Sequence, residues 1–500
     1  MLSSLFGKKS DHPMSDIKSA QALLGELPKN DAHKMLMELT EWVESVGENT
    51  DFKLDHYFAV LRLLDEAAQP CVRKLSREYF VPQALSKFQE NRLWLALGNW
   101  SHHAASAYFD VFERYCNGDK GAIKVPLLAA RAASALRGYL KYVSAHYGPM
   151  DPQFWSKVAR LYRHAEQNQY LDERIELYSG APEGTTVRCE LVRLLGWYGC
   201  GVDTLSPLYM HLTECIVGQY SSSVSLTAQQ SADSLFSFDL DHPAAPLRIK
   251  AGGRVLPATR FIAMATMSSR LEALLKELAK NAVPQEINLG GNYAAEVVRE
   301  AAQYLLNYLT DPPLRRSPRR GINVSLKVAN GFSRILDHTD AGLNFNQDQP
   351  QRWEVEDISA SGFRTVLPMR GADGVRIGSL LGVQPEGVSH WGVAVVRRLM
   401  CDESSRMHVG AEMLAHQVAG VTLAGGAEEE GHALWLLAKP EDSYGEVRLM
   451  MKAETFAPQR SLQTRFKGKN YLLLPLRLEE QGMDYDLAGF RVVEQEGSEG

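Results

Sequence analysis

Residues 311–328, DPPLRRSPRRGINVSLKV, mark the point at which the chain changes from one kind of structure to another. Pro312 and Pro313 stop the helical pattern that precedes them, because proline lacks a backbone donor and clashes with the preceding turn. From Ile322 onward, apolar residues alternate with polar or small ones, as in a half-buried strand. The stretch therefore predicts a domain boundary near residue 311, with helices before it and β-structure after it.

Arginine supplies four of the six residues from Arg315 to Arg320, in a chain whose formal net charge is −6. A local cationic cluster on an acidic chain indicates one anionic ligand rather than general attraction for polyanions. Two arginines four residues apart on a flexible segment can contact both sides of such a ligand. Arg316 and Arg320 are the preferred pair, and Arg315 with Arg319 is the alternative frame.

The chain before the boundary is predicted to be largely helical. Residues 1–16 are polar and small and are expected to form a loose N-terminus. From residue 17 to residue 220, apolar residues recur at three- and four-residue spacing, which predicts a helical domain. The segment 221–310 is mixed, because serine-rich and turn-rich sequence precedes two helices. The predicted helices are Ala32–Val46, Leu54–Ala67, Ala84–Tyr115, Val125–Tyr147, Gln153–Asn168, Ala263–Lys280 and Tyr293–Tyr308.

Short strands with glycine-rich turns follow the boundary. They predict a small antiparallel barrel over residues 311–415 and a second β unit over residues 416–495. The expected fold class is therefore multidomain α+β, with a large helical N-terminal region before both β units. The predicted strands are Ile322–Val328, Trp353–Ile358, Gly362–Leu367, Leu380–Gln384, Trp391–Leu399, His408–Leu414, Leu434–Ala438, Glu446–Met451, Leu462–Phe466, Tyr471–Leu476 and Gly489–Val493.

Composition excludes several classes of protein. The chain has 45% hydrophobic and 23% charged residues, as soluble globular proteins do. Its pI near 6.2 argues against a nucleic-acid binder. No apolar run approaches the roughly 20 residues that a membrane span needs, and the N-terminus does not resemble a signal peptide. The six cysteines are scattered without a Cys-x-x-Cys pair, which favours reduced thiols and a cytoplasmic location over disulfides or zinc.

A second motif lies downstream of the arginines. Asp357-Ile358-Ser359-Ala360-Ser361-Gly362 has the Asp-x-Ser-x-x-Gly spacing of a polar turn between two strands. The two motifs occur in this order, are separated by strands, and are followed by further strands that resemble those of PilZ domains. Together these features make residues 314–414 similar to PilZ domains. The resemblance implies a six-stranded barrel that binds cyclic di-GMP, with the arginine segment wrapped around the ligand. The stretch Asn330–Gln351 is longer than the family usually has between these motifs.

The chemistry of these residues suits a cyclic dinucleotide, which carries two phosphates and two guanines. A guanidinium contacts phosphate oxygens bidentately and stacks on a base. Asp357 can accept hydrogen bonds from the N1–H and amino group of a guanine, and Ser359 can add a hydroxyl contact. Gly362 permits a backbone geometry, or a close ligand approach, that a side chain would block. The predicted ligand-binding residues are Arg316, Arg320, Asp357, Ser359 and Gly362, with Arg315 and Arg319.

Other patterns are interpreted as structural. His102 and His103 are adjacent on a helix and point to different faces, so they are not taken as a metal pair. Glu272-Ala273-Leu274 and Gly425-Gly426-Ala427-Glu428-Glu429 superficially match cyclic-dinucleotide enzyme motifs but lack the surrounding α/β pattern. We therefore expect no catalytic residue, no metal and no cofactor.

The sequence thus predicts a cytoplasmic receptor in which ligand binding orders the arginine linker and reorients the domains. The ligand is cyclic di-GMP, and an unidentified protein partner is expected to bind the helical region. The alternative is a helical interaction scaffold whose PilZ-like domain no longer binds nucleotide. A third hypothesis, a cyclic-dinucleotide enzyme, rests only on the two short motifs above.

Overall fold

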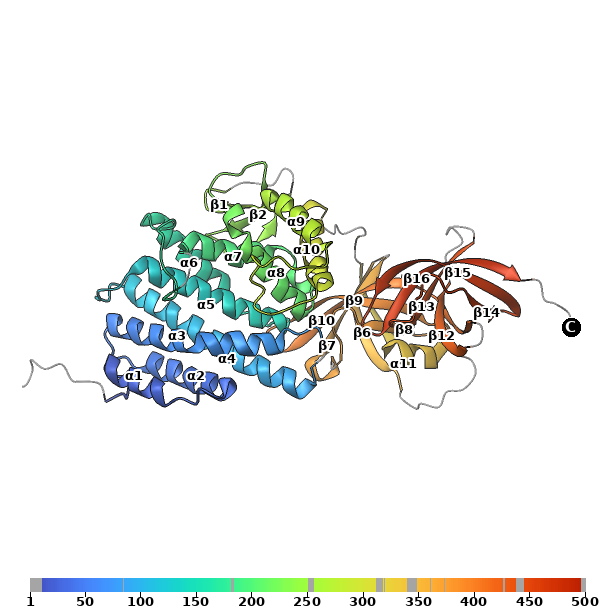
Figure 1. Cartoon of the computed structure of the whole chain (residues 1–500), viewed down its shortest axis with the longest axis horizontal. Helices are drawn as coiled ribbons and strands as arrows, with labels where there is room; N and C mark the ends of the chain where they lie inside the picture. Colours follow the sequence, from blue (N-terminus) through green and yellow to red (C-terminus); the bar gives the residue numbers. More distant parts are fainter. Residues whose placement is uncertain are drawn as a thin grey trace, which may run out of the picture. The chain divides into compact units, whose positions relative to one another are not determined.

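The computed structural model describes residues 11–83, 85–180, 184–250, 256–311, 318, 320–339, 349–359, 361–372, 374–425, 428–437 and 445–495. The chain divides into two units, residues 1–313 and 314–500. The first contains most of the helices and the second contains two β-barrels (Figure 1). The predicted multidomain α+β fold is therefore confirmed.

Helices form the body of the first unit. They are α1 (Ile17–Glu26), α2 (Ala32–Glu48), α3 (Leu54–Tyr79), α4 (Lys87–Cys116), α5 (Val125–Ala145), α6 (Phe154–Gln167), α7 (Val187–Gly199), α8 (Pro207–Gln219), α9 (Ala265–Leu278) and α10 (Ala295–Thr310). Between α8 and α9 lies a small antiparallel sheet in the order β1-β4-β2-β3, made of β1 (Ser225–Thr227), β2 (Ser234–Asp239), β3 (Leu247–Arg248) and β4 (Thr259–Ala263).

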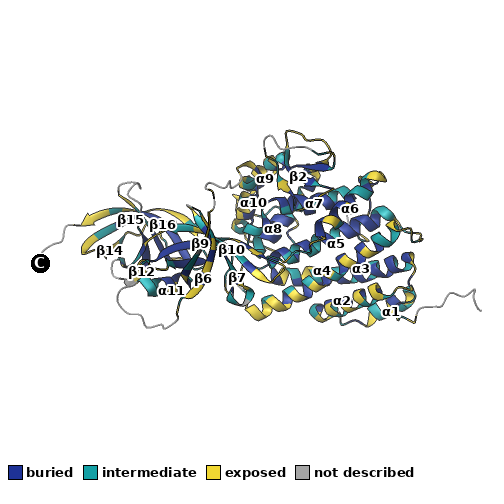
Figure 2. Cartoon of the chain, turned by 180° about the vertical axis from the view of Figure 1, so that it is seen from behind, coloured by how far each residue is buried: buried dark blue, intermediate teal, exposed yellow. Residues whose placement is uncertain are grey.

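Helix α5 is the central helix of this unit, since it packs against α4, α6, α7 and α8. Twelve of its 21 residues are buried, and Figure 2 shows buried residues along α5 and the neighbouring α7. A helix that is buried on most sides is normally apolar all round. Helix α5 instead carries Arg131, Arg137 and Lys141, so each of these cations needs a partner from another helix.

The first barrel is closed, with strand order β10-β7-β6-β5-β8-β9. Its strands are β5 (Arg320–Asn330), β6 (Gln351–Ser359), β7 (Gly362–Pro368), β8 (Leu380–Pro385), β9 (Gly392–Cys401) and β10 (Arg406–Ala415). All neighbouring strands are antiparallel, as the alternation of apolar residues predicted. Helix α11 (Phe332–Thr339) lies between β5 and β6, in the stretch that the sequence marked as unusually long.

The second barrel is also closed, with strand order β11-β12-β13-β16-β15-β14. Its strands are β11 (Val418–Gly425), β12 (Glu428–Leu436), β13 (Glu446–Lys452), β14 (Leu462–Phe466), β15 (Lys469–Gln481) and β16 (Tyr485–Gln495). Helix α11 contacts strands of both barrels, and Asp484 of the second barrel accepts a hydrogen bond from the Phe332 amide at its N-terminus. Arg397 of β9 forms a bidentate ion pair with Glu480 of β15.

Some elements differ from the sequence prediction. The predicted helix Leu54–Ala67 extends to Tyr79 through Pro70, because Ala68, Cys71 and Leu75 continue the buried face beyond the proline. Strand β4 was missed because all five of its residues are buried, so it shows no alternation of apolar and polar residues.

Candidate functional site

The pairing of β5 with β6 brings Arg320, the last residue of the arginine segment, beside the second predicted motif. Arg320 is the first residue of β5 and pairs in register with Ile358, while the next residue, Gly321, pairs with Asp357. The Arg320 side chain is exposed, and no hydrogen bond or ion pair joins it to another described residue. Arg315, Arg316 and Arg319 lie outside the described residues.

A break in strand register positions Asp357. Val355 pairs with Thr365, but Asp357, two residues later, pairs with Arg364, only one residue away on β7. Such bulges re-aim side chains and are common beside functional sites. The guanidinium of Arg364 contacts Asp357 Oδ2 at 2.9 Å through Nε and Glu356 Oε2 at 2.9 Å through Nη2. Arg364 therefore holds the Asp357 carboxylate in place, with that side chain 14% exposed.

Ser359 and Gly362 close the turn between β6 and β7. The Ser359 hydroxyl donates to the Gly362 carbonyl oxygen at 3.2 Å. A Cβ at Gly362 would lie 2.2 Å from the carbonyl oxygen of Ala411 on the adjacent β10. Backbone packing inside the barrel therefore requires glycine at this position, which gives Gly362 a structural role whatever the barrel binds.

Strand pairing extends the site into a row across five strands. Asp357 lies between Gly321 and Arg364, and Arg364 pairs in turn with Gly410, which pairs with Arg398. Gly321 is exposed, whereas a Cβ at Gly410 would lie 3.3 Å from the Cβ of Arg398, so that arginine covers part of the Gly410 position. A flat group can approach the sheet at Gly321, beside the Asp357 carboxylate and Arg364. This arrangement offers donors for phosphate and an acceptor for the edge of a base.

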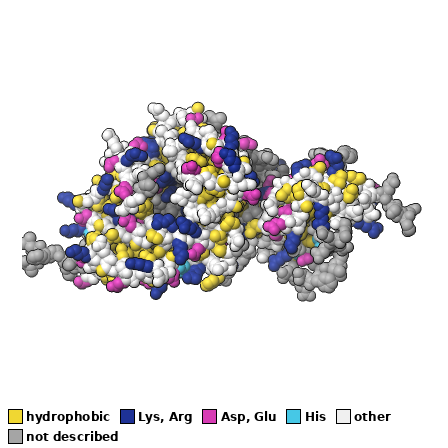
Figure 3. All heavy atoms as spheres, in the orientation of Figure 1, with side chains coloured by type: hydrophobic (Ala, Val, Ile, Leu, Met, Phe, Trp, Pro, Cys, Tyr) yellow, Lys and Arg dark blue, Asp and Glu magenta, His cyan; other side chains and the backbone are white. Residues whose placement is uncertain are grey.

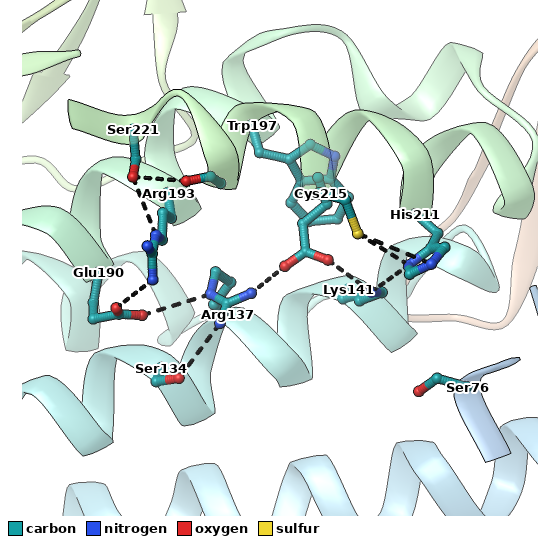
Figure 4. Close-up of polar contacts among 12 residues, drawn as sticks. Ser76, Ser134, Arg137, Lys141, Glu190, Arg193, Trp197, His211, Cys215 and Ser221 are labelled. Carbon is teal, nitrogen blue, oxygen red and sulfur yellow. Dashed lines mark hydrogen bonds and ion pairs between the residues drawn. The ribbon is translucent and has the colours of Figure 1, made fainter. Parts of the chain in front are cut away.

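A second polar cluster lies in the helical unit, where sequence analysis predicted no site (Figure 4). Helix α5 supplies Arg137 and Lys141, and helix α8 supplies His211 and Glu214. Lys141 Nζ lies 2.6 Å from Glu214 Oε2 and 2.7 Å from His211 Nδ1, while Arg137 donates to Glu214 Oε1. The other side of the Arg137 guanidinium faces the fully buried carboxylate of Glu190 on α7, at 3.8 Å.

The charges of this cluster depend on one another. Burial alone would raise the pKa of Glu214, but Lys141 and Arg137 outweigh it and hold that pKa well below its usual range. Burial would also lower the pKa of Lys141, yet Glu214 raises it, so the amine stays protonated. Burial, helped by the charge of Lys141, lowers the pKa of His211 to about 3. The cluster at neutral pH is thus two cations, one carboxylate and a neutral imidazole.

The same cluster has the residue types of a metal site, since ligand atoms of His211, Glu214 and Cys215 lie within 4.8 Å of one another. The contacts argue against that interpretation. His211 Nε2 lies 2.9 Å from the Leu289 carbonyl, an acceptor, so Nδ1 carries the lone pair and accepts from Lys141. The Lys141 ammonium therefore already provides the positive charge beside these ligand atoms.

His102 and His103, which the sequence analysis considered as a metal pair, lie next to each other on α4. The rings of His102 and His103 lie 5.3 Å apart, edge to face. All six cysteines are free thiols. None of the described helices is both long enough and apolar enough to span a membrane.

The helical cluster was missed because its partners are far apart in sequence. Arg137 and Lys141 meet Glu214 across 77 and 73 residues, so no local motif records the contact. One signal was present: Arg131, Arg137 and Lys141 interrupt an otherwise apolar segment that α5 buries. Charged residues in such a segment are almost never fully buried without a partner.

We expect the helical unit to lose stability as the pH falls below about 6.5, because buried His211 stays neutral while the unfolded chain takes up a proton. The pKa of about 3 in the folded state places the loss between pH 6.5 and pH 3. Over the first two pH units below 6.5, the loss in free energy of unfolding amounts to roughly 2–3 kcal/mol, because each pH unit contributes up to about 1.4 kcal/mol. Hydrogen exchange in α8 at pH 7 and pH 5 measures it.

The variant His211→Gln is neutral at both pH values and keeps a donor and an acceptor, so its α8 should lose less stability on acidification. Lys141, Glu214, Cys215 and Tyr293 also face the ring, and they remain in the variant. The exposed His242→Gln is the control and should change nothing. An equal pH dependence in the His211→Gln variant and the unchanged chain would contradict the assignment.

Comparison with known families places similarity in the helical unit. Residues 18–231 match the family model described as cyclic-di-GMP receptor FimW, N-terminal domain. Over this region, less than half of the chain, the protein is similar to a cyclic di-GMP receptor family. The match ends before the barrels and does not extend to the PilZ-like segment. Neither the comparison with curated proteins nor the comparison with solved structures found a match.

Proposed function

We propose that this protein is a receptor for cyclic di-GMP that binds the dinucleotide at the first barrel and catalyses no reaction on it. The observation that carries the proposal is the register of β5 and β6, in which Arg320 enters the barrel opposite Ile358, next to Asp357. Arg320, the last arginine of the cationic segment, and the Asp357 carboxylate thereby lie on neighbouring strands of one closed barrel. The similarity of the helical unit to a cyclic di-GMP receptor family supports the same ligand.

Each residue has a distinct role in this proposal. Arg316 and Arg320 bind the phosphates and stack on the bases, with Arg315 and Arg319 as the alternative pair. Asp357, oriented by Arg364, accepts hydrogen bonds from the edge of a guanine, and Ser359 adds a hydroxyl contact. Gly321 leaves the sheet uncovered on one side of the Asp357–Arg364 pair, and Gly410 with Arg398 continues the row on the other side. The row of five residues is therefore the surface against which a base lies.

Charge distribution is consistent with one local anion site. On the face shown in Figure 3, Lys and Arg side chains are interspersed with Asp and Glu. An extended surface of one sign, as nucleic-acid binders present, is not seen on that face. The proposed ligand is accordingly a small, doubly charged molecule that a local arginine cluster recognises.

Isothermal titration of the full chain with cyclic di-GMP tests the proposal and gives affinity and stoichiometry together. We expect saturable binding, with cyclic di-AMP as the control for recognition of guanine. Adenine lacks the adjacent N1–H and amino donors that Asp357 is proposed to bind, so it should bind more weakly. If cyclic di-GMP produced no saturable binding heat at any concentration tested, the receptor function would be rejected.

The ligand is further proposed to act as a switch, because the arginine segment lies between α10 and β5, where the two units join. Closing this segment around a dianion should fix the orientation of one unit relative to the other. Small-angle scattering of the full chain with and without cyclic di-GMP measures this. We expect a change in the distance distribution that Arg320→Ala suppresses; identical curves at saturating ligand would refute the reorientation.

One observation favours a second function. The family similarity lies in the helical unit rather than in the PilZ-like barrel, so the helices are also a candidate working part, as a scaffold that binds a protein partner. In that case the barrel would not bind nucleotide, and the titration above would remain flat. The two functions are therefore separated by one measurement. A cytoplasmic location suits either one.

A further inference from the structure

A cavity of about 230 Å³ lies inside the helical unit, with walls from α3, α4, α5 and α8. Its wall on α5 follows from helical periodicity, because Ser134, Arg137, Gly138 and Lys141 share one face at spacings of three, four and seven. Ser134 and Gly138 are small and leave the space open, while Arg137 and Lys141 point their charges into the polar cluster described above.

The cavity has more hydrogen-bond donors than acceptors. Lys141 can donate three hydrogen bonds, and its contacts to Glu214 and His211 account for two. The Nη2 group of Arg137 has only a 3.5 Å contact to Ser134, at the limit of a hydrogen bond. Arg73 lines the cavity from α3, and its exposed side chain has no hydrogen bond or ion pair with another described residue. Donors thus remain available at both the floor and the rim.

The two carboxylates that line the cavity are already paired. Glu214 accepts from Arg137 and Lys141, as shown above. Asp65 accepts from Gln69 and Tyr108 at 2.7 Å each and from Arg131 at 2.6 Å. The negative charges therefore face partners in the protein, and the side chain of Arg73 has no ion pair with another described residue. A cavity of this kind favours an anion.

The size of the cavity separates its ligand from the dinucleotide. Sites for drug-sized ligands measure about 300–1,000 Å³. The present cavity is smaller, and a cyclic dinucleotide has two purines and a twelve-membered phosphate ring. Trp100, Tyr142 and Tyr178 supply aromatic wall on the sides of the cavity. The space fits a small molecule with an apolar part and one anionic group.

We propose that this cavity is a second ligand site, which binds a small organic anion through Arg137, Lys141 and Arg73. The anionic group is a carboxylate or a phosphate. It accepts hydrogen bonds from the N–H groups of Arg137 and Lys141 that do not already donate to Glu214, His211 or Ser134. Arg137 and Lys141 are held in place by Glu214 and Glu190, so the site is preorganised. The proposal does not depend on whether the first barrel binds cyclic di-GMP.

Calorimetry of the full chain at constant ionic strength tests the site with three probes: benzoate, succinate and inorganic phosphate. We expect saturable binding of at least one probe, with a dissociation constant in the millimolar range or tighter. Choline, a cation of similar size, should not bind. Comparison of benzoate and succinate with phosphate distinguishes a carboxylate site from a phosphate site. Failure of all three probes to bind would overturn the proposal.

Two variants test whether the probes bind in this cavity, and neither replaces a residue of the buried ion pairs. Gly138→Leu fills the cavity, and Gly138→Ala is its control, since a Cβ there meets only Ser101 Oγ at 3.8 Å. We expect at least about tenfold weaker probe binding in Gly138→Leu, a loss of about 1.4 kcal/mol, and little change in Gly138→Ala. Unchanged probe binding in Gly138→Leu, with the chain still folded by circular dichroism, would contradict the assignment.

The rim is tested by Arg73→Gln, with the adjacent exposed Lys74→Gln as a control that removes the same charge outside the cavity. Arg73→Gln should weaken probe binding about three- to tenfold, because a charge at the rim is partly screened. Lys74→Gln should have no effect, and equal losses in the two variants would indicate general charge attraction instead of a site. Titration of Gly138→Leu with cyclic di-GMP should match the unchanged chain, which separates this site from the barrel.

Discussion

Replacing Arg320 by alanine is expected to weaken the binding of cyclic di-GMP about ten- to a hundredfold. A charge-assisted hydrogen bond contributes roughly 1.5–3 kcal/mol, and each 1.4 kcal/mol is a factor of ten in affinity. The Arg320 side chain is exposed and forms no hydrogen bond or ion pair with a described residue, so the substitution removes ligand contacts without leaving a protein group unpaired. Arg316→Ala should cause a similar loss. Isothermal titration of each variant measures both effects.

The matched control is Arg352→Ala, which removes the same charge from an exposed position on β6 of the same barrel. Arg352 pairs with Glu386 at 2.7 Å, with side chains 64% and 68% exposed, and such surface pairs contribute little to stability. We expect its affinity to stay within about twofold of the unchanged chain. If Arg316→Ala and Arg320→Ala bind as Arg352→Ala does, the arginine segment is not the site. If Arg315→Ala and Arg319→Ala alone lose affinity, the alternative frame is correct.

Elements with a regular local pattern could be predicted from the sequence. The strands of the first barrel were recognised because apolar residues alternate and turns punctuate them, and the helices from α2 to α6 because their buried faces repeat every three to four residues. The sequence pattern predicted a helix end wrongly, or missed a strand, where tertiary contacts override the local preferences of proline or the usual alternation of a strand. Pro70 lies within α3 because the buried faces on both sides of it keep the helix continuous. Strand β4 is buried on both faces and carries no alternation.

The same distinction applies to the sites. Asp357 and Gly362 lie in one short motif, so their spacing was visible. The register that brings Arg320 beside Asp357 was not, because helix α11 lies between β5 and β6 and the pairing shifts between Gly321 and Val324. The bulge that sets Asp357 beside Arg364 could not be read from the sequence. The cluster around Glu214 joins three helices, α5, α7 and α8, and only the packed structure shows that its charges meet.

The second buried ion pair of the helical unit leads to the largest expected loss of stability. Arg131 of α5 is 1% exposed and donates to Asp65 of α3 at 2.6 Å and to Glu66 at 2.9 Å. Tyr108 donates to the same Asp65 oxygen, and the ring of Tyr178 lies 3.9 Å from the guanidinium carbon. Removing one partner of such a pair leaves an uncompensated charge on a buried side chain.

Arg131→Met is therefore expected to destabilise the helical unit by about 3–5 kcal/mol, since methionine keeps most of the volume and removes the charge that Asp65 needs. The chain has more than one unit, so a single unfolding midpoint is not a sound measure. Hydrogen exchange in α3 and α5 reports the local free energy of opening. The control is Arg163→Met, whose partner Asp241 is 61% exposed, and it should cost at most about 1 kcal/mol.

The double variant Arg131→Met with Asp65→Asn distinguishes a lost charge from lost packing. Asparagine removes the stranded charge and still offers an oxygen to Tyr108, so the double variant should be more stable than Arg131→Met alone. If packing of the arginine stem were the cause, the second substitution would add its own loss instead. A double variant as unstable as the sum of the two single ones would show that Asp65 and Arg131 act independently, contrary to the geometry.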